Sequence, residues 1–283
     1  GGVVTTTQPD APHGLRHAAL NPDWLVPQWP APAHVHAVFT TRNGGVSRPP
    51  FDSMNLGRPS GDDAQAVDAN RARLRAALGV SPIYLSQVHG TRSVVLDTAQ
   101  GPGTIEADAC TTATPGVVCT MRVADCLPVL FTDTAGRAVG AAHAGWRGLA
   151  EGVLESCFAQ WVQQLPAQAD ADGAAVAQQT LAWLGPCIGP QAFEVGPEVR
   201  AAFVERDASA GTCFSPQPAG KWLADLAALA RMRLQHMGIT RIYGNDGSAG
   251  WCTVNNPLRF FSHRRDNIAL GGSGRMAACI WRT

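Results

Sequence analysis

The sequence predicts an α+β fold: a single domain of mixed β-sheets flanked by helices. Three observations support this prediction. Short runs rich in β-branched and apolar residues recur along the chain, as buried strands do. Between them, several longer segments repeat their apolar residues at helical spacing. No internal repeat or linker divides the 283 residues, a length that is sufficient for one domain with a sizeable core.

The N-terminal part of the chain combines predicted strands with one predicted helix. Residues 1–20 are polar and contain proline, so we expect a flexible arm, followed by a single domain at 21–283. The helix is predicted from Ser60 to Leu78, with Ser60 or Asp62 as its N-cap and Gly79 at its end. Strands are predicted at residues 34–41, 83–89, 93–97 and 107–112.

The sequence in the middle of the chain predicts a strand, a turn, a second strand, a corner bounded by glycines and a helix, in that order. Its predicted strands are residues 117–123, 127–131 and 138–142, and its helix runs from Leu149 to Leu165, before Pro166. A surface loop is predicted at 166–179. The remaining predictions are strands at 181–184, 239–243 and 276–281, helices at 197–207 and 221–237, and a polar, glycine-rich region at 246–274.

The composition excludes several classes of protein. The 22 basic residues are balanced by 22 acidic ones, so nothing indicates binding to nucleic acid or to an anionic membrane surface. No apolar run is long enough to span a bilayer. The N-terminal residues lack the pattern of a signal peptide, and the eight cysteines lack paired spacing. We therefore expect reduced thiols and a cytoplasmic location.

Three residues form the candidate chemical centre. Cys126 and His143 lie seventeen residues apart, on segments that are expected to pair as a hairpin. His89 ends another strand-like run and, like His143, is close to a glycine. Two imidazoles and a thiolate form a three-ligand set for a tetrahedral metal, with the fourth position left for water. Structural zinc takes four protein ligands, so a set of three favours catalysis.

Other interpretations of this centre remain open. A buried cysteine is commonly a small apolar residue, and a histidine at a strand end is commonly structural. Cys126 and His143 also fit a nucleophile and its base, in a hydrolase without metal. A further alternative is a zinc-stabilised module without enzymatic activity.

Several motifs occur in a characteristic order along the chain. They are TTRNGGVS and DSMNLG (40–47, 52–57), SQVHG (86–90), ADCLPV (124–129), AHAGWRG (142–148), GPCIG with AFEVG (185–189, 192–196), and FFSHRRD with SGRMA (260–266, 273–277). Together they resemble the YfiH-type family, also called the laccase-domain or polyphenol oxidoreductase family, over roughly residues 37–282. Two positions, His263 and Cys187, depart from the commonest pattern of that family.

The resemblance implies a YfiH-like fold, grouped with cysteine-hydrolase-like folds, and a cytoplasmic monomer. It also implies that His89, Cys126 and His143 bind zinc. Members of this family include purine nucleoside phosphorylases with adenosine deaminase activity and the peptidoglycan editing factor. We therefore expect a catalytic domain that acts on a purine nucleoside (adenosine, inosine or guanosine) with phosphate. A hydrolase that edits peptidoglycan precursors is the alternative.

The two expected reactions require further residues. Proton transfer during deamination needs an acid or base, and Asp108 or Asp125 could serve, although a carboxylate at a strand end is equally often a turn cap. Phosphorolysis needs an anion seat, for which Arg147 and the amides near Gly148 are candidates. A surface salt bridge is the alternative role for Arg147. Arg42 and Asn55, in glycine-flanked turns, are predicted to line the same pocket.

Copper chemistry is disfavoured. A multicopper oxidase needs on the order of ten histidine ligands, commonly in His-x-His pairs. This chain has eight histidines, and only His34 and His36 form such a pair. Copper can still occupy a nitrogen and sulfur site in vitro, because Cu²⁺ binds such ligands more tightly than Zn²⁺ does.

Overall fold

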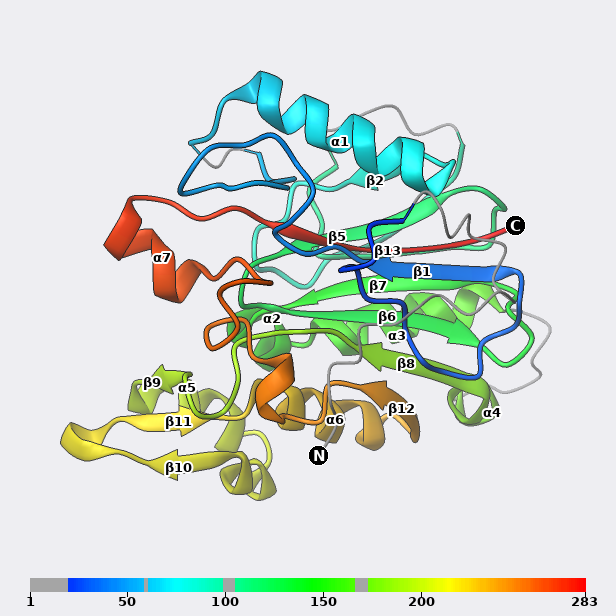
Figure 1. The fold of residues 1–283 in the computed structure, drawn as a ribbon. Coiled ribbons are helices and arrows are strands. Elements are labelled where there is room, and N and C mark those ends of the chain that lie inside the picture. Colours follow the sequence, from blue (N-terminus) through cyan, green and yellow to red (C-terminus); the bar gives the residue numbers. More distant parts are fainter. Residues whose placement is uncertain (1–19, 59–60, 99–104, 166–172) are drawn as a thin grey trace.

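The computed structural model describes residues 20–58, 61–98, 105–165 and 173–283. Two large β-sheets pack against each other, and helices cover the outer face of each (Figure 1). Met121 and Ile280 of one sheet pack with Leu130, Ala141 and Trp183 of the other in a shared core. The predicted class is confirmed: α+β, with mixed sheets flanked by helices.

The first sheet has four strands in the order β1 (Val35–Phe39), β13 (Met276–Arg282), β5 (Val118–Val123) and β2 (Pro82–Tyr84). β13 pairs antiparallel with β1 and β5, whereas β2 runs parallel to β5. Helix α1 (Ala64–Leu78) covers the outer face and packs Leu74 into a cluster with residues of β1, β5 and β13. Gly79 ends this helix at φ 74°, a left-handed conformation that favours glycine.

The second sheet has six strands in the order β12 (Arg241–Gly244), β8 (Thr180–Leu184), β6 (Leu127–Asp133), β7 (Val139–Ala144), β4 (Ala109–Thr112) and β3 (Ser93–Val95). β6 and β7 form the predicted hairpin. The outer face packs against α2 (Trp146–Glu151), α3 (Val153–Gln164) and α6 (Leu226–His236).

A third, smaller sheet lies at one end of the molecule (Figure 1). Its strands are β10 (Phe214–Pro216), β11 (Trp222–Ala224) and β9 (Glu194–Val195). The remaining elements are α4 (Ala174–Gln179), α5 (Pro197–Val204), α7 (His263–Leu270) and the 3-10 helices η3 (Ala208–Cys213), η4 (Pro218–Gly220) and η5 (Ala249–Trp251).

The structure corrects the predicted helix at 221–237. Residues 222–224 form β11, and α6 begins only at Leu226. Asp225 separates the two elements, because its side chain accepts a hydrogen bond from the amide of Ala228 and caps the helix. Trp222 and Leu223 fit the helical spacing by coincidence, and pairing with β9 fixes them as strand.

Other boundaries also differ from the prediction. Residues 174–179 form α4 rather than loop, and α7 lies within the polar region at 246–274. β2 ends at Tyr84, so His89 lies in a loop rather than at the end of a strand. α1 begins at Ala64 with Asp63 as its cap. Ser60, residues 1–19 of the predicted arm and residues 166–172 of the predicted loop lie outside the described residues.

Within the described part of the chain, no helix has both the length and the apolar character needed to cross a membrane.

Candidate metal centre and adjoining pocket

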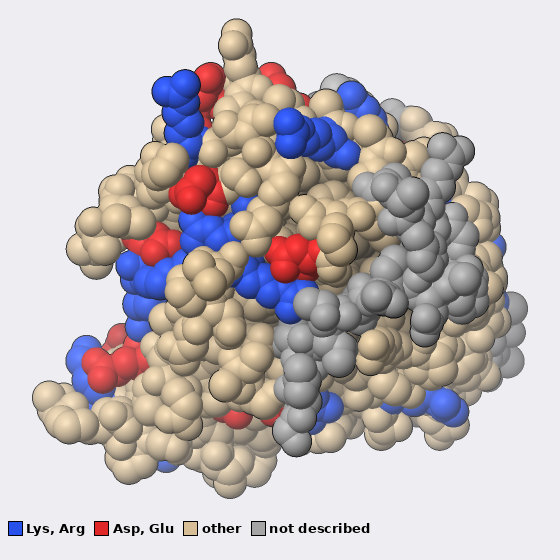
Figure 2. Space-filling view, in the orientation of Figure 1, with Lys and Arg blue, Asp and Glu red and all other residues tan. Residues whose placement is uncertain are grey.

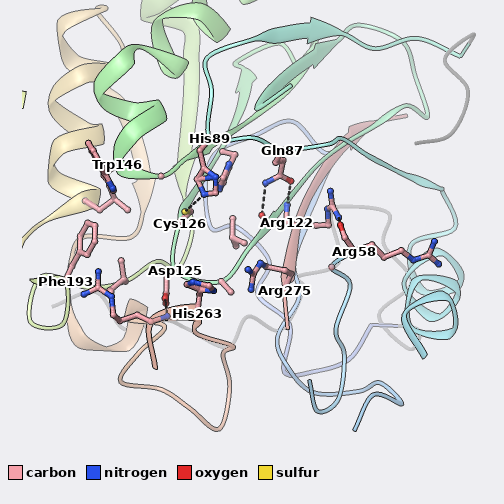
Figure 3. Close-up of a pocket in the computed structure, with 18 residues that line it drawn as sticks. Arg58, Gln87, His89, Arg122, Asp125, Cys126, Trp146, Phe193, His263 and Arg275 are labelled. Atoms are coloured by element: carbon pink, nitrogen blue, oxygen red, sulfur yellow. Dashed lines mark hydrogen bonds between the residues drawn. The ribbon is translucent and has the colours of Figure 1, made fainter. Parts of the chain in front are cut away.

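His89, Cys126 and His143 come together at one place, although they lie on three different segments (Figure 3). His143 is on β7, directly opposite Pro128 of β6. Cys126 immediately precedes β6, so the pairing of the hairpin places it beside the last residues of β7. His89 reaches the same place from the loop after β2.

Cys126 lies where the chain passes from one large sheet to the other. β5 belongs to the four-stranded sheet and β6 to the six-stranded sheet, with only residues 124–126 between them. Asp125 has φ 110°, a conformation that L residues rarely adopt. Its backbone carbonyl accepts a hydrogen bond from the amide of Ile188, which helps to hold this sharp connection. Such backbone strain is common at functional sites.

Asp108 orients both histidines. Its carboxylate accepts hydrogen bonds from the amides of Val88, His89 and Gly90 at 2.9–3.0 Å. These bonds fix the loop in which His89 has φ 60°. Asp108 Oδ2 also lies 2.8 Å from Nδ1 of His143. That contact places the proton of His143 on Nδ1 and leaves Nε2 for the centre, as in many carboxylate–histidine–metal groups.

The donor atoms fit a tetrahedral metal. One ligand atom from each of His89, Cys126 and His143 lies within 4.8 Å of the others, and Sγ of Cys126 is 3.8 Å from Nε2 of His89. Zinc bonds of about 2.0–2.3 Å give ligand separations of this order. A Cβ added at Gly145 would lie 2.9 Å from Sγ of Cys126, so glycine is needed for this close packing.

The electrostatics of the centre follow from burial and from neighbouring charge. Burial acts to lower the pKa of His143, but Cys126 and Asp108 outweigh it and raise the pKa to about 9. Burial and His143 lower the pKa of His89. Burial acts to raise the pKa of Asp108, yet hydrogen bonds from His143 and the amides hold that pKa below its usual value. Metal binding therefore has to displace a proton from His143.

A pocket of about 420 Å³ adjoins the three donors. Its walls differ in chemistry. In Figure 3 the aromatic residues Trp146 and Phe193 lie on one side, and Arg58, Arg122 and Arg275 lie on the other. The lining also includes Arg264, whose guanidinium lies over the ring of Phe193. Basic side chains gather across the middle of the face in Figure 2, between α1 and the three-stranded sheet. The pocket is therefore suited to a ligand with a flat apolar part and an anionic part.

Among the lining residues, Arg275 is the most suitable hydrogen-bond donor for a bound anion. Its side chain points toward Asp125 and His263 in Figure 3, whereas Arg58 points away toward α1. Nη1 of Arg275 donates to the carbonyls of Ser273 and Gly274. Its Nε and Nη2 make no hydrogen bond to any residue that the structure describes. Burial lowers the pKa of Arg275, and an anionic ligand would restore a partner to its charge.

The three residues predicted to line this pocket do not form its wall. Arg42 donates to Asp52 and to the carbonyl of Pro257, and it stacks on Phe261. Asn55 is buried and holds the backbone of Arg275, because its side-chain oxygen accepts a hydrogen bond from the backbone amide of Arg275. Arg147 lies over the ring of Trp146. The charge of Arg147 still contributes to the lowered pKa of His89, after burial and His143, which lower it, and Asp108, which raises it. The predicted lining therefore differs from the observed one, and the roles of the three residues in binding substrate stay predictions.

The two candidate acid–base residues also differ in position. Asp108 is fully buried and lies outside the pocket wall. Asp125 is a lining residue, and burial raises its pKa. Its carboxylate accepts hydrogen bonds from the hydroxyl of Thr253 at 2.7 Å and from the amide of Arg264 at 2.6 Å.

The sequence interpretation missed the cationic wall. Arg122 and Arg275 belong to β5 and to the residue before β13, where they resemble ordinary strand flanks. The available signal was the pair of motifs FFSHRRD and SGRMA, which contain His263 and Arg275 but were not assigned a role.

Comparisons with known proteins identify the family of this chain. Residues 36–283 match the model of a family described as multi-copper polyphenol oxidoreductase laccase. A purine nucleoside phosphorylase of Pseudomonas aeruginosa is 48% identical over 259 residues, which cover 91% of this chain and 98% of the relative. The purine nucleoside phosphorylase YfiH of Escherichia coli is also 48% identical, over 262 residues, with the same coverage.

Solved structures show the same fold. A Neisseria meningitidis protein of the DUF152 family model superposes with a TM-score of 0.80 at 45% identity, covering 92% of this chain and 99% of that protein. YlmD of Geobacillus stearothermophilus superposes with a TM-score of 0.76 at 29% identity, covering 88% and 92%. The resemblance noted from the motifs is confirmed, and the chain belongs to the YfiH-like family of multi-copper polyphenol oxidoreductase laccases.

Proposed function

We propose that this protein is a zinc-dependent purine nucleoside enzyme. It would cleave adenosine, inosine and guanosine with phosphate and would also deaminate adenosine. The observation that supports this most is the cluster of His89, Cys126 and His143 beside a pocket with one aromatic and one cationic wall. The names of the relatives from P. aeruginosa and E. coli support phosphorolysis in particular.

Zinc is the metal that this donor set favours. Two imidazoles and one thiolate are borderline and soft ligands, and three protein ligands leave a fourth position open. When bound there, zinc would supply a Lewis acid that lowers the pKa of water toward neutrality. Asp108 would keep His143 in the tautomer that binds metal, through the contact at Nδ1.

The two walls suggest how a nucleoside binds. The base would lie along the aromatic wall, where Trp146 and Phe193 offer flat apolar surface. Phosphate would bind on the cationic wall, where Nε and Nη2 of Arg275 have no hydrogen-bond partner among the described residues. The two reacting groups would then meet in front of the three donors. A volume of about 420 Å³ is in the range of pockets for small organic ligands.

Asp125 is the residue that we propose for proton transfer. It is a carboxylate of the pocket wall and is adjacent in sequence to Cys126. The hydrogen bonds from Thr253 and Arg264 would hold its carboxylate in one orientation toward the bound base. Asp108, which lies behind His143, would act as a positioning residue only.

The test is a paired assay on adenosine and inosine. Ammonia and free base are measured with zinc removed and restored, each with and without phosphate. We expect ammonia release to need zinc but not phosphate, and base release to need both.

Two results would contradict the proposal. If a chelator spares both reactions while alkylation of Cys126 abolishes them, the protein is a metal-free cysteine hydrolase. If neither product forms under any condition, the substrate is of another class, and peptidoglycan precursors are tested next. Metal analysis of the purified protein distinguishes zinc from copper.

A further inference from the structure

A second cavity, of about 340 Å³, lies beside α1 and has no part in the proposed chemistry. It is lined by α1, by the loop before α1 and by the start of β2. Asp68, Arg71 and Arg75 follow one another at spacings of three and four residues, so they share one face of α1. Its remaining lining residues are Arg58, Ser81, Pro82 and Tyr84.

The charge of this cavity is unbalanced. Three guanidinium groups line it, but Asp68 is the single carboxylate among the lining residues, and it pairs with Arg58. Arg71 donates through Nε and Nη2 to the carbonyl of Leu56, at 3.2 and 2.9 Å, which fixes the position of its guanidinium. Arg75 is exposed in the last turn of the helix. A dianion would neutralise the excess charge.

Tyr84 provides a second, independent observation. Its ring lies beneath the guanidinium of Arg71, 3.8 Å from ring centroid to Cζ. Its hydroxyl is buried and has no hydrogen-bond partner among the residues that the structure describes. Because that hydroxyl is buried, the ring of Tyr84 and not its hydroxyl faces the cavity. The cavity therefore offers charge beside an aromatic ring.

We propose that this cavity binds a small phosphate monoester, such as a pentose phosphate or a nucleoside monophosphate. The phosphate would bind between Arg71 and Arg75, and the organic part of the ester would lie beside Tyr84 and Pro82. The volume supports an ester rather than a bare ion, because about 340 Å³ lies in the range of pockets for small organic ligands. Arg58 also lines the main pocket, so a ligand here would contact a residue that both cavities share.

The chain permits a direct test, because it contains only two tyrosines, Tyr84 and Tyr243. The protein is labelled with 3-fluorotyrosine, and its two ¹⁹F resonances are assigned with Tyr243→Phe. Ribose 5-phosphate, AMP, ribose and inorganic phosphate are then titrated separately. We expect the two esters to shift the Tyr84 resonance saturably, ribose to leave it unchanged, and inorganic phosphate to bind at least tenfold more weakly. The relative strength of the two esters distinguishes a sugar phosphate from a nucleotide.

Arg75→Gln is the test variant, and Arg73→Gln on the same helix is its matched control, because Arg73 does not line the cavity. We expect Arg75→Gln to raise the Kd of the esters at least tenfold and the control to leave it unchanged.

The proposal is overturned if no ester shifts Tyr84, if Arg75→Gln leaves the Kd unchanged, or if inorganic phosphate binds as tightly as the esters, which would indicate an adventitious ion only. Phosphorolysis is measured on the same samples. The Tyr84 titration is therefore informative even if the proposed function fails.

Discussion

The two walls of the main pocket are held in place in different ways. Cys126 and His143 lie at the ends of the paired strands β6 and β7, whereas His89 lies in the loop after β2, and one buried carboxylate, Asp108, holds both histidines. The cationic wall has a mixed origin: Arg122 is on β5 and Arg275 directly precedes β13, whereas Arg58 comes from the segment before α1 and His263 begins α7. The part of the wall near His263 is supported by side-chain hydrogen bonds among residues 253–266.

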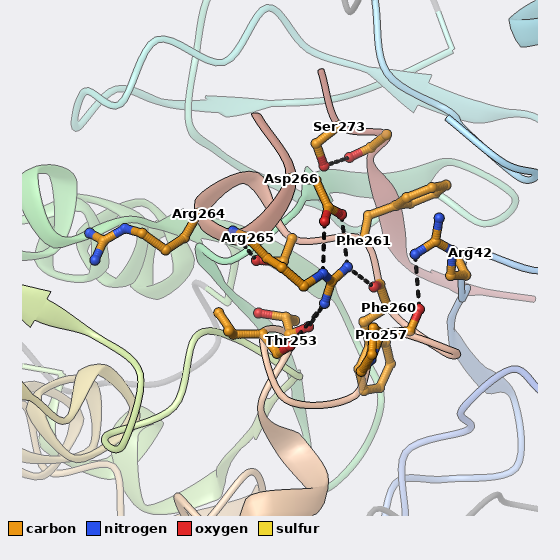
Figure 4. Close-up of polar contacts among 12 residues, drawn as sticks. Arg42, Thr253, Pro257, Phe260, Phe261, Arg264, Arg265, Asp266 and Ser273 are labelled. Carbon is orange, nitrogen blue, oxygen red and sulfur yellow. Dashed lines mark hydrogen bonds and ion pairs between the residues drawn. The ribbon is translucent and has the colours of Figure 1, made fainter. Parts of the chain in front are cut away.

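Arg265 is the centre of that support (Figure 4). Its Nη1 donates to the carbonyls of Thr253 and Val254, at 2.8 and 2.9 Å, and Nη2 donates to the carbonyl of Phe260. Its guanidinium also pairs with the buried Asp266, at 2.8 Å. One side chain thus ties together the loop that presents Thr253 to Asp125 and the helix that begins at His263.

The metal donors and the cationic residues of this pocket are therefore held in place by different parts of the structure. The β6–β7 hairpin and the hydrogen bonds of Asp108 hold the donors in the narrow geometry that a metal requires. An anion needs less precision from the arginines, since a charge tolerates more variation in distance than a coordination bond does. Substitutions on the two walls should therefore separate metal binding from phosphate binding.

The largest effect is expected for Cys126→Ser, on the donor wall. A hydroxyl is a poor replacement for a thiolate on zinc, so both metal content and turnover of adenosine should fall on the order of 100-fold or more. Zinc analysis and ammonia release measure the two losses. Cys213→Ser, far from the donors, is the control and should retain zinc. A variant at 126 that keeps full metal content and activity would show that the thiolate is not a ligand.

Asp108→Asn tests whether the donor wall depends on its supporting carboxylate. The amide keeps the shape of the side chain but loses the charge that His143 Nδ1 and three backbone amides share. We expect zinc affinity to fall about 10–100-fold. Competition with a chelator measures it. An unchanged affinity would contradict the role of Asp108 in orienting the ligands.

Arg275→Gln tests the cationic wall. Loss of a charged hydrogen bond of about 1.5–3 kcal/mol should raise the KM for phosphate roughly 10–100-fold, with zinc content unchanged. Arg275→Lys should restore part of the loss. Arg147→Ala is measured in the same assay, because the sequence suggested Arg147 as the residue that binds phosphate. If Arg147→Ala raises the KM and Arg275→Gln does not, the phosphate binds at the start of α2 instead.

Arg265→Lys should have the smallest effect, and mainly on stability. Lysine keeps the charge but cannot reproduce the forked contacts to Thr253, Phe260 and Asp266. We expect a loss of about 1–2 kcal/mol, or a Tm lower by about 2–8 °C. Arg241→Lys, whose side chain makes a single contact to the carbonyl of Gln178, is the control and should leave Tm nearly unchanged. An equal fall in both variants would show that Arg265 has no special role.

The sequence by itself determined the fold class and brought the three donors into one hypothesis. Runs rich in β-branched and apolar residues and apolar residues at helical spacing are local properties, so they predicted β5 to β7 and α3 directly. The hairpin of β6 and β7 then required Cys126 and His143 to be neighbours. The motif order supplied the family.

Only the tertiary structure decided which arginines face the pocket. Arg42 and Arg147 appeared suitable because glycines flank them, yet Arg42 is held by Asp52 and Pro257, and Arg147 lies on Trp146. Arg275 gave no local signal that it faces a pocket, and its backbone amide is held by the side chain of Asn55, 220 residues earlier in the chain. Such contacts between distant segments are set by how the sheets and loops pack, and no window of sequence contains them.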